Sequence, residues 1–87
     1  MSTYNLLIIT PNGKVFDDQI EALTAPGSEG YFGVLAHHAP MVALLKKGLL
    51  KIKKDASELF FNIESGILEV SSLDHNVLIL ADQSQKI

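Results

Sequence analysis

Short apolar runs bounded by turn-forming residues recur roughly every eight to twelve residues along this chain, a spacing that favours an all-β sandwich or barrel. Residues 48–54 show the pattern most clearly, because Leu50 and Ile52 alternate with Lys51 and Lys53. A period of two is typical of a β-strand with one solvated face. We therefore predict an all-β fold, a flattened β-sandwich of about 8–10 strands.

The first part of the chain predicts a hairpin and then a loop. Residues 6–9 form a continuous apolar run, which suits a strand covered on both faces. Asn12-Gly13 is a strong hairpin signal, and we expect the return strand to run from Val15 through Ala25. Residues 28–30 are too polar for a strand interior and predict an exposed loop.

The rest of the chain predicts six further strands. They span residues 32–35, 41–45, 48–54, 59–63, 67–70 and 77–80. Pro40 lacks an amide hydrogen and belongs at a strand start or edge, and Ser65-Gly66 predicts a bend or bulge. Residues 39–50 carry some apolar residues at helical spacing, but Pro40 and Gly48 bracket them and the end of the segment alternates, which favours strands over a helix.

Length and composition restrict the class of protein. Eighty-seven residues predict a single domain spanning residues 1–87. The net charge is −3 and all seven basic residues are lysine, which argues against nucleic-acid binding because phosphate and base recognition favours arginine. The chain has no cysteine, no apolar run near the ~20 residues that span a bilayer and no basic region before its first apolar run. We expect a cytosolic protein, or one held at a membrane only by partners.

Histidines are the first candidates for a chemical site. His37 and His38 are adjacent, and His75 is the third histidine. Neighbouring residues of a strand point to opposite faces, so these two would not easily share a metal ion. Metal ligation also needs three or four converging ligands. We therefore interpret the pair as part of a loop or an interface and predict no metal site.

Signals for catalysis are missing from the sequence. Its carboxylates are scattered, and no Gly-X-Ser-X-Gly or phosphate-binding glycine loop is present. We predict a protein that is not an enzyme and that binds no cofactor.

Two segments are candidates for binding. Five of the seven lysines lie within residues 46–54 and form either a basic face for an acidic partner or lipid, or an edge strand protected against edge-to-edge pairing; the second interpretation is favoured. Tyr31 and Phe32 lie between glycines, where an aromatic pair provides an anchor. Tyr31 is expected to be the exposed member, and Phe32 fits the core equally well.

Several segments together resemble the N-terminal β-sandwich of the epsilon subunit of rotary ATP synthases, called delta in mitochondria. They are Ser28-Glu29-Gly30-Tyr31-Phe32-Gly33, His38-Ala39-Pro40-Met41-Val42, Ser65-Gly66-Ile67-Leu68-Glu69-Val70 and residues 77–82. The resemblance covers nearly the whole chain. It departs from the family pattern where Ala36-His37 replaces a frequent Pro-Gly and where Ser65 replaces the first glycine of a Gly-Gly bend.

The resemblance implies a rotor subunit of the central stalk that couples proton or sodium transport to ATP synthesis without catalysing a reaction itself. It implies docking on the gamma subunit and on the c-ring of the membrane sector. The implied c-ring-facing residues are Ser28, Glu29, Gly30, Tyr31 and Phe32. The implied gamma-facing residues are Thr10, His38, Ala39, Pro40, Met41 and Ala43.

Many members of the family carry a C-terminal helical hairpin, whereas this sequence stops at Ile87, after the last predicted strand, as either a short, sandwich-only member or a truncated chain would. We accordingly expect no helical hairpin in this chain and no nucleotide binding. The implied location is the cytoplasmic face of the bacterial plasma membrane, as a peripheral protein, with the plastid thylakoid as the second choice. The alternative is a stand-alone β-sandwich module that binds a protein or a lipid.

Overall fold

The structure, a computed structural model, describes residues 2–87. Within these residues the chain forms ten β-strands and no helix. The strands are β1 (Tyr4–Thr10), β2 (Gly13–Ile20), β3 (Ala22–Gly27), β4 (Gly30–Leu35), β5 (Met41–Leu45), β6 (Gly48–Lys54), β7 (Ser57–Ile63), β8 (Gly66–Val70), β9 (Val77–Ala81) and β10 (Ser84–Lys86).

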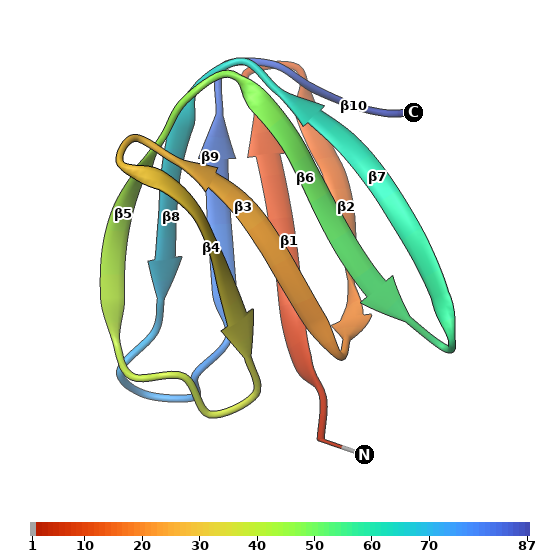
Figure 1. The fold of residues 1–87 in the computed structure, drawn as a ribbon, viewed down its shortest axis with the longest axis vertical. Coiled ribbons are helices and arrows are strands. Elements are labelled where there is room, and N and C mark those ends of the chain that lie inside the picture. Colours follow the sequence, from red (N-terminus) through yellow and green to blue (C-terminus); the bar gives the residue numbers. More distant parts are fainter. Residues whose placement is uncertain (1) are drawn as a thin grey trace.

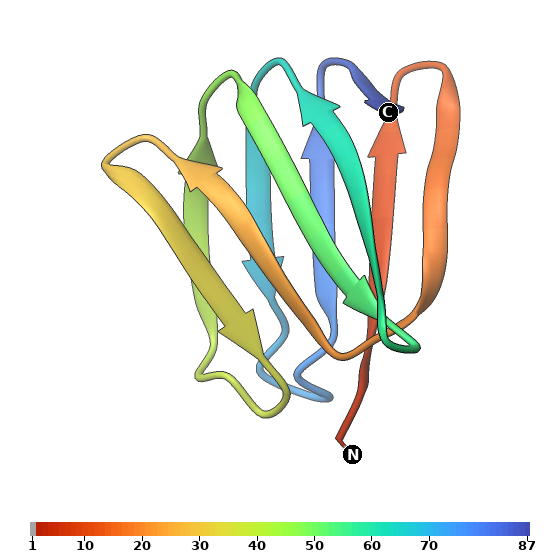
Figure 2. The ribbon, with the colours of Figure 1, turned by 45° about the vertical axis from the view of Figure 1, so that its right-hand side comes forward.

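The strands form one continuous sheet that folds into two layers. Their order is β10-β7-β6-β3-β5-β8-β9-β1-β2, and β4 pairs with β3 outside this path. The sheet turns from one layer to the other where Gly27 of β3 meets Leu45 of β5. Figures 1 and 2 show one layer made of β5, β8, β9, β1 and β2, called the β1 layer below, and a second made of β4, β3, β6, β7 and β10, called the β6 layer. The predicted all-β sandwich is confirmed.

The core lies between the layers and follows the alternation seen in the sequence. Leu6 and Ile8 of the β1 layer and Leu50 and Ile52 of the β6 layer are fully buried. At the open side of the sandwich, the rings of Phe16 and Phe61 contact each other edge to face, with centroids 5.5 Å apart. Burial of these apolar side chains is the main favourable contribution to folding.

The β1–β2 and β6–β7 hairpins use different turns. The predicted β1–β2 hairpin forms, but its last pair is Thr10 with Gly13, so Pro11 and Asn12 are the turn residues; Gly13 begins β2 with a φ of 121°, which a residue with a side chain rarely adopts. Neither Pro11 nor Asn12 has a positive φ, so this turn differs from the two-residue type in which both central residues are left-handed. The β6–β7 turn is of that type, because Asp55 and Ala56 have φ values of 52° and 63°.

Three sequence-based expectations are corrected. The expected strand from Val15 through Ala25 is two strands, β2 and β3, that lie in different layers and are separated at Glu21. The reason is the spacing of two buried residues. Ile20 and Leu23 are both buried, but residues three positions apart would point to opposite faces of a single strand. Strand β10 was not expected, since Ser84, Gln85 and Lys86 carry no apolar pattern and pair with β7 through the backbone.

The third correction concerns the lysine-rich segment. Strand β6 was interpreted as an edge strand protected by its lysines, but it pairs with β3 on one side and β7 on the other. Its lysines therefore mark the solvated face of an interior strand. The hydrogen-bonding edges of β6 need no protection, because both are occupied.

Tyr4 joins the two layers through a buried hydrogen bond. Its hydroxyl donates to the carbonyl oxygen of Val34 in β4 at 2.6 Å, and its ring is almost completely buried. Burial raises the pKa of the Tyr4 hydroxyl well above its usual range. The hydroxyl is therefore a permanent donor at any physiological pH.

We expect Tyr4→Phe to lower the free energy of unfolding by about 1–2 kcal/mol, because the Val34 carbonyl is left without its partner in the core. Urea denaturation of wild type and variant measures the effect. An unchanged midpoint would show that the hydrogen bond contributes nothing net.

Candidate functional site: an uncovered apolar sheet face

The outer surface of the β1 layer is apolar across four neighbouring strands. Side chains paired across the strands form two rows on this surface, which is called the outer face below. The first row contains Leu44 (β5), Ile67 (β8), Leu80 (β9) and Ile9 (β1), and the second contains Val42, Glu69, Leu78 and Leu7 in the same strand order. Seven of these eight side chains are therefore apolar.

No other part of residues 2–87 covers the outer face. Among its most exposed members, the exposed fraction runs from 41 % for Ile67 to 67 % for Val42. Leu7, Ile9 and Leu78 are half-buried. Contiguous exposed apolar surface makes the outer face a candidate site of interaction with another macromolecule.

This result corrects the prediction for residues 6–9. The continuous apolar run indicated a strand covered on both faces, but the chain covers only the face that carries Leu6 and Ile8. Leu7 and Ile9 point to the outer face and keep part of their surface exposed. The sequence thus contains apolar residues for a second contact that this chain does not itself make.

Polar side chains border the outer face along β2. Asp17, which is paired with Leu7, accepts hydrogen bonds from Lys14 at 3.0 Å and from Asn5 at 3.2 Å. The Lys14 ammonium, and then the Asn5 amide, lower the pKa of Asp17. The apolar surface therefore ends at a charged and hydrogen-bonded margin.

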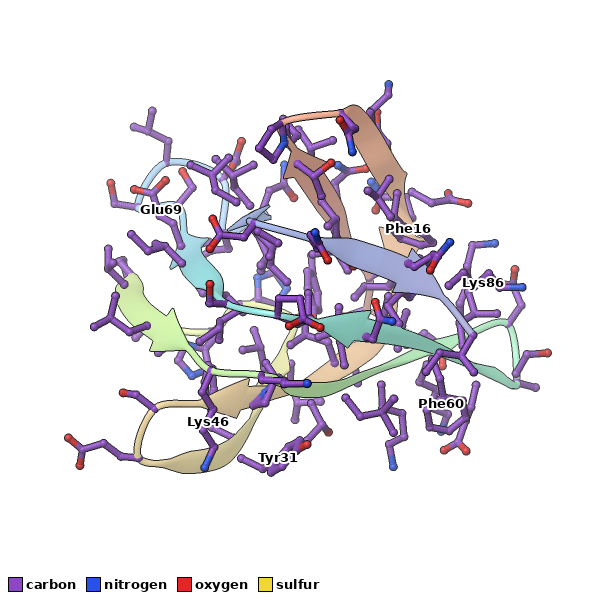
Figure 3. All side chains as sticks on the ribbon, turned by 90° about the horizontal axis from the view of Figure 1, so that it is seen from above. Phe16, Tyr31, Lys46, Phe60, Glu69 and Lys86 are labelled. Carbon is purple, nitrogen blue, oxygen red and sulfur yellow. The ribbon has the colours of Figure 1, made fainter. Side chains whose placement is uncertain are left out.

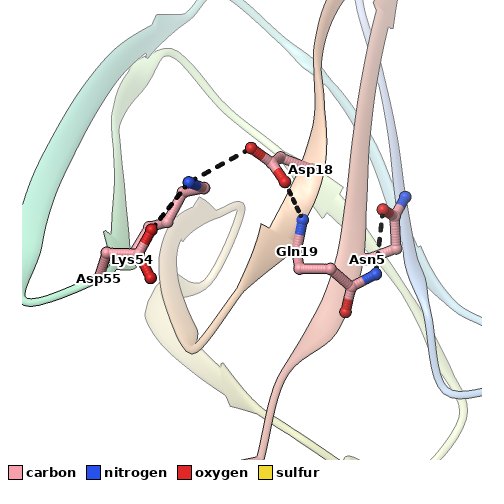
Figure 4. A network of polar contacts seen from close by, with 5 residues as sticks. All are labelled: Asn5, Asp18, Gln19, Lys54 and Asp55. Atoms are coloured by element: carbon pink, nitrogen blue, oxygen red, sulfur yellow. Dashed lines mark hydrogen bonds and ion pairs between the residues drawn. The ribbon is translucent and has the colours of Figure 1, made fainter.

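The same border continues into a network that joins β2 to the β6–β7 turn (Figure 4). Lys54 contacts the carboxylates of Asp55 at 3.1 Å and Asp18 at 3.3 Å, and these two groups raise its pKa. The backbone amide of Gln19 donates to the Asp18 carboxylate, and the side-chain amide of Gln19 donates to the side-chain oxygen of Asn5. Lys54 thus has a structural role, and within the lysine-rich segment Lys51 also has an acidic partner, Glu58, at 3.6 Å.

The residues implied to face the gamma subunit do not form one patch in the structure. Thr10 is the last residue of β1, which ends at the opposite end of the sandwich from the β4–β5 loop that holds His38, Ala39 and Pro40 (Figure 1). Thr10 is also buried, and its hydroxyl is used within the hairpin, where it accepts from Asn12 and donates to Gly13.

Met41 and Ala43 lie on the inner side of β5. Both are half-buried, and they alternate with Val42 and Leu44 of the outer face. Met41 packs against the core, and Ala43 is paired with the fully buried Leu68. The resemblance implied gamma contacts for Met41 and Ala43, whose side chains face the core, whereas the exposed side of β5 carries Val42 and Leu44.

The histidines lie in two neighbouring loops. His37 and His38 belong to the β4–β5 loop and not to a strand, so the argument from opposite strand faces does not apply to them. His37 has a φ of 63°, the left-handed conformation that glycine adopts without strain. The family that this sequence resembles often has glycine at this position.

His75 links the second loop to the first. Its Nδ1 atom lies 3.0 Å from the carbonyl oxygen of His38, and its ring contacts the His37 ring edge to face with centroids 6.0 Å apart. In residues 2–87, no three histidine or carboxylate side chains are placed to hold a metal ion. The contacts therefore describe two loops fastened together.

The residues implied to face the c-ring lie at the tip of the β3–β4 hairpin. Ser28, Glu29, Gly30 and Tyr31 are exposed, as predicted, but only Ser28 and Glu29 form the loop, because β4 begins at Gly30. The Tyr31 hydroxyl accepts a hydrogen bond from the Leu49 amide at 3.1 Å, which holds the ring against the start of β6. Phe32 is half-buried and packs against the core, so Tyr31 is the member of the pair available to a partner.

A family model decides the relationship of this chain to known proteins. The model for the β-sandwich domain of the ATP synthase delta/epsilon chain matches residues 3–87. The chain belongs to this family. The resemblance seen in the sequence is therefore confirmed.

Related sequences agree with this assignment. An ATP synthase epsilon chain from Sulfurovum sp. is 49 % identical over 71 residues, which cover 80 % of this chain and 56 % of that protein. One from Protochlamydia amoebophila is 43 % identical over 86 residues, which cover 97 % of this chain and 56 % of that protein. The epsilon-family chain described here thus spans little more than half the length of these relatives.

Solved structures show the same fold. A chain in the mitochondrial ATP synthase of Euglena gracilis, in a structure of OSCP, F1 and c-ring, superposes with a TM-score of 0.90 at 22 % identity, over 99 % of this chain and 54 % of that one. A chain in the central stalk and c-ring of the Tetrahymena thermophila enzyme gives a TM-score of 0.80 at 19 % identity, over 95 % of this chain and 66 % of that one. Within residues 2–87, no helix is long and apolar enough to cross a membrane.

Proposed function

We propose that this epsilon-family chain is a non-catalytic rotor subunit of the central stalk of a rotary ATP synthase. It docks on the gamma subunit and on the c-ring, and it helps to couple proton or sodium transport to ATP synthesis. Family membership supports a place in the ATP synthase complex. The bacterial relatives support a peripheral location on the cytoplasmic face of the bacterial plasma membrane. The plastid thylakoid is the second choice.

The uncovered outer face is the observation that carries this proposal. Four strands present seven apolar side chains to solvent or leave them half-covered. Stable protein interfaces have an apolar centre and a polar rim, and the outer face has this arrangement along β2. We assign this face to the gamma subunit, with His38, Ala39 and Pro40 extending the contact at the β4–β5 loop.

A rigid body suits a part that transmits torque. The two layers share a close-packed core and a continuous sheet, and close-packed interiors are poorly compressible and transmit strain. The hairpin tip with Ser28, Glu29, Gly30 and Tyr31 then faces the c-ring, while the outer face holds the gamma subunit. This chain performs no chemistry in the proposed role and needs no nucleotide.

Co-purification with the cognate gamma subunit, followed by size-exclusion chromatography, tests the proposal. We expect a stable one-to-one complex. A folded chain that elutes alone in the presence of gamma would contradict docking through this domain.

We expect Tyr31→Ala to impair assembly with the c-ring by about tenfold while the fold survives, because it removes an exposed aromatic anchor. Pull-down with purified c-ring and gamma measures assembly, and thermal denaturation checks the fold. Tyr31→Phe is the matched control, since it removes only the hydroxyl that accepts from Leu49. Normal assembly of the alanine variant would exclude Tyr31 from the contact.

A further inference from the structure

We propose that the partner surface on the outer face carries a lysine or arginine side chain that pairs with Glu69. This inference rests on the proposed docking of the gamma subunit and goes beyond it by naming the chemistry of the surface that docks. The carboxylate of Glu69 is the one ionisable group among the eight side chains of the two rows.

Glu69 lies in the second row with an apolar side chain on each side of it, and polar side chains, among them Asn5, Asp74 and Asn76, lie beyond this row. It is paired with Val42 on one side and with Leu78 on the other, and Ile67 precedes it by two residues on the same face of β8. Figure 3 shows Glu69 on the side of the sandwich away from Tyr31 and Lys46. Any partner that covers the apolar rows therefore covers this carboxylate as well.

Covering an unpaired carboxylate would oppose docking. A charge that leaves water without a partner costs several kcal/mol, and within residues 2–87 no lysine or histidine forms an ion pair with Glu69. The apolar rows favour docking only if the partner compensates this charge. A cationic side chain does so most completely, since charge-assisted hydrogen bonds are stronger than neutral ones.

The surface beside Glu69 has room for such a side chain. A hollow of about 270 Å³ lies next to it and is lined by Asn5, Leu7, Glu69, Asp74, Asn76 and Leu78, among others. Leu7 and Leu78 provide an apolar wall for the aliphatic stem of a lysine or arginine, while Glu69 and Asp74 provide carboxylates for its head. The backbone amide of Asn76 donates to the Asp74 carboxylate at 3.0 Å. This hydrogen bond lowers the pKa of Asp74 and so favours the charged form of this second carboxylate.

Three substitutions at Glu69, measured against the purified cognate gamma subunit, test the pairing. Glu69→Gln keeps the size and the acceptor oxygen but loses the charge, and we expect about tenfold weaker binding. Glu69→Leu matches the apolar neighbours and leaves the partner's cation buried alone, for which we expect about a hundredfold loss. Glu69→Lys should abolish the complex. Glu58→Gln removes an exposed carboxylate from the β6 layer and is expected to bind as wild type does.

The outcomes separate this inference from the proposed function. If Glu69→Leu binds gamma as tightly as wild type does, or more tightly, gamma docking stands and the pairing is overturned. Absence of binding by the folded wild-type chain would overturn the docking itself and the pairing with it. Light scattering on the chain alone gives a further check: a dimer broken by Glu69→Lys would show that a second copy covers the face, against the assignment made here.

Discussion

Gly66→Ala is expected to lower the free energy of unfolding by about 2–3 kcal/mol, because β8 passes too close to β9 for a side chain at this position. A Cβ atom on Gly66 would lie 2.3 Å from the carbonyl oxygen of Leu80 and 3.0 Å from the Cα of Ala81. Both are backbone atoms of a strand that is hydrogen-bonded on its two sides, to β8 and to β1. Neither can move aside as the end of a flexible side chain could.

Thermal and urea denaturation of the isolated chain measure this effect. For a domain of this size, a loss of that magnitude lowers the melting temperature by roughly 10–20 °C. Gly33→Ala is the matched control, since its new Cβ would approach nothing closer than the Leu23 carbonyl oxygen at 3.7 Å and its φ is not left-handed. Equal stability of the two variants would show that β8 and β9 separate at little cost.

Alternation along the chain predicted most strands because each interior strand has one face in the core. Leu50 and Ile52 are fully buried while Lys51 and Lys53 are exposed, as the pattern of β6 required. The prediction failed where this rule does not operate. Strand β10 has no apolar pattern. It pairs with β7 through backbone groups, which every sequence carries, so no residue pattern predicted it.

Backbone conformation set another limit. His37 adopts the left-handed conformation although it is neither glycine nor asparagine, and that conformation is uncommon for residues with a side chain. The contact between the His37 and His75 rings joins loops that are 38 positions apart in the sequence. Local propensity contains no information about such a pairing.

The candidate site could be predicted only in part for a related reason. The sequence identifies Leu7, Ile9, Leu78 and Leu80 as apolar strand residues, and for residues 6–9 the continuous apolar run predicted a strand covered on both faces. Whether a second layer, another segment or a partner provides that cover depends on the complete fold. Once the layers are assigned, the apolar strand residues whose side chains do not point into the core identify the outer face.

Leu44→Glu is expected to weaken binding to the gamma subunit by about a hundredfold or more while leaving the fold unchanged. Leu44 is 61 % exposed and begins the first row of the outer face beside Ile67. Substitution of an exposed side chain alters the free energy of unfolding by only about 0.5 kcal/mol. In the complex the new carboxylate would be buried without a partner, at a cost of several kcal/mol, and each 1.4 kcal/mol corresponds to about a factor of ten in affinity.

Leu35→Glu is the matched control for this experiment. Leu35 is also a leucine at the surface of a strand, 67 % exposed, but it lies on β4 in the β6 layer. Isothermal titration of gamma with wild type and both variants compares the two faces directly. Loss of affinity only for the Leu44 variant would assign the outer face to gamma. Equal affinity of both variants would exclude that face and leave the β4–β5 loop, with His38, Ala39 and Pro40, as the contact to be examined.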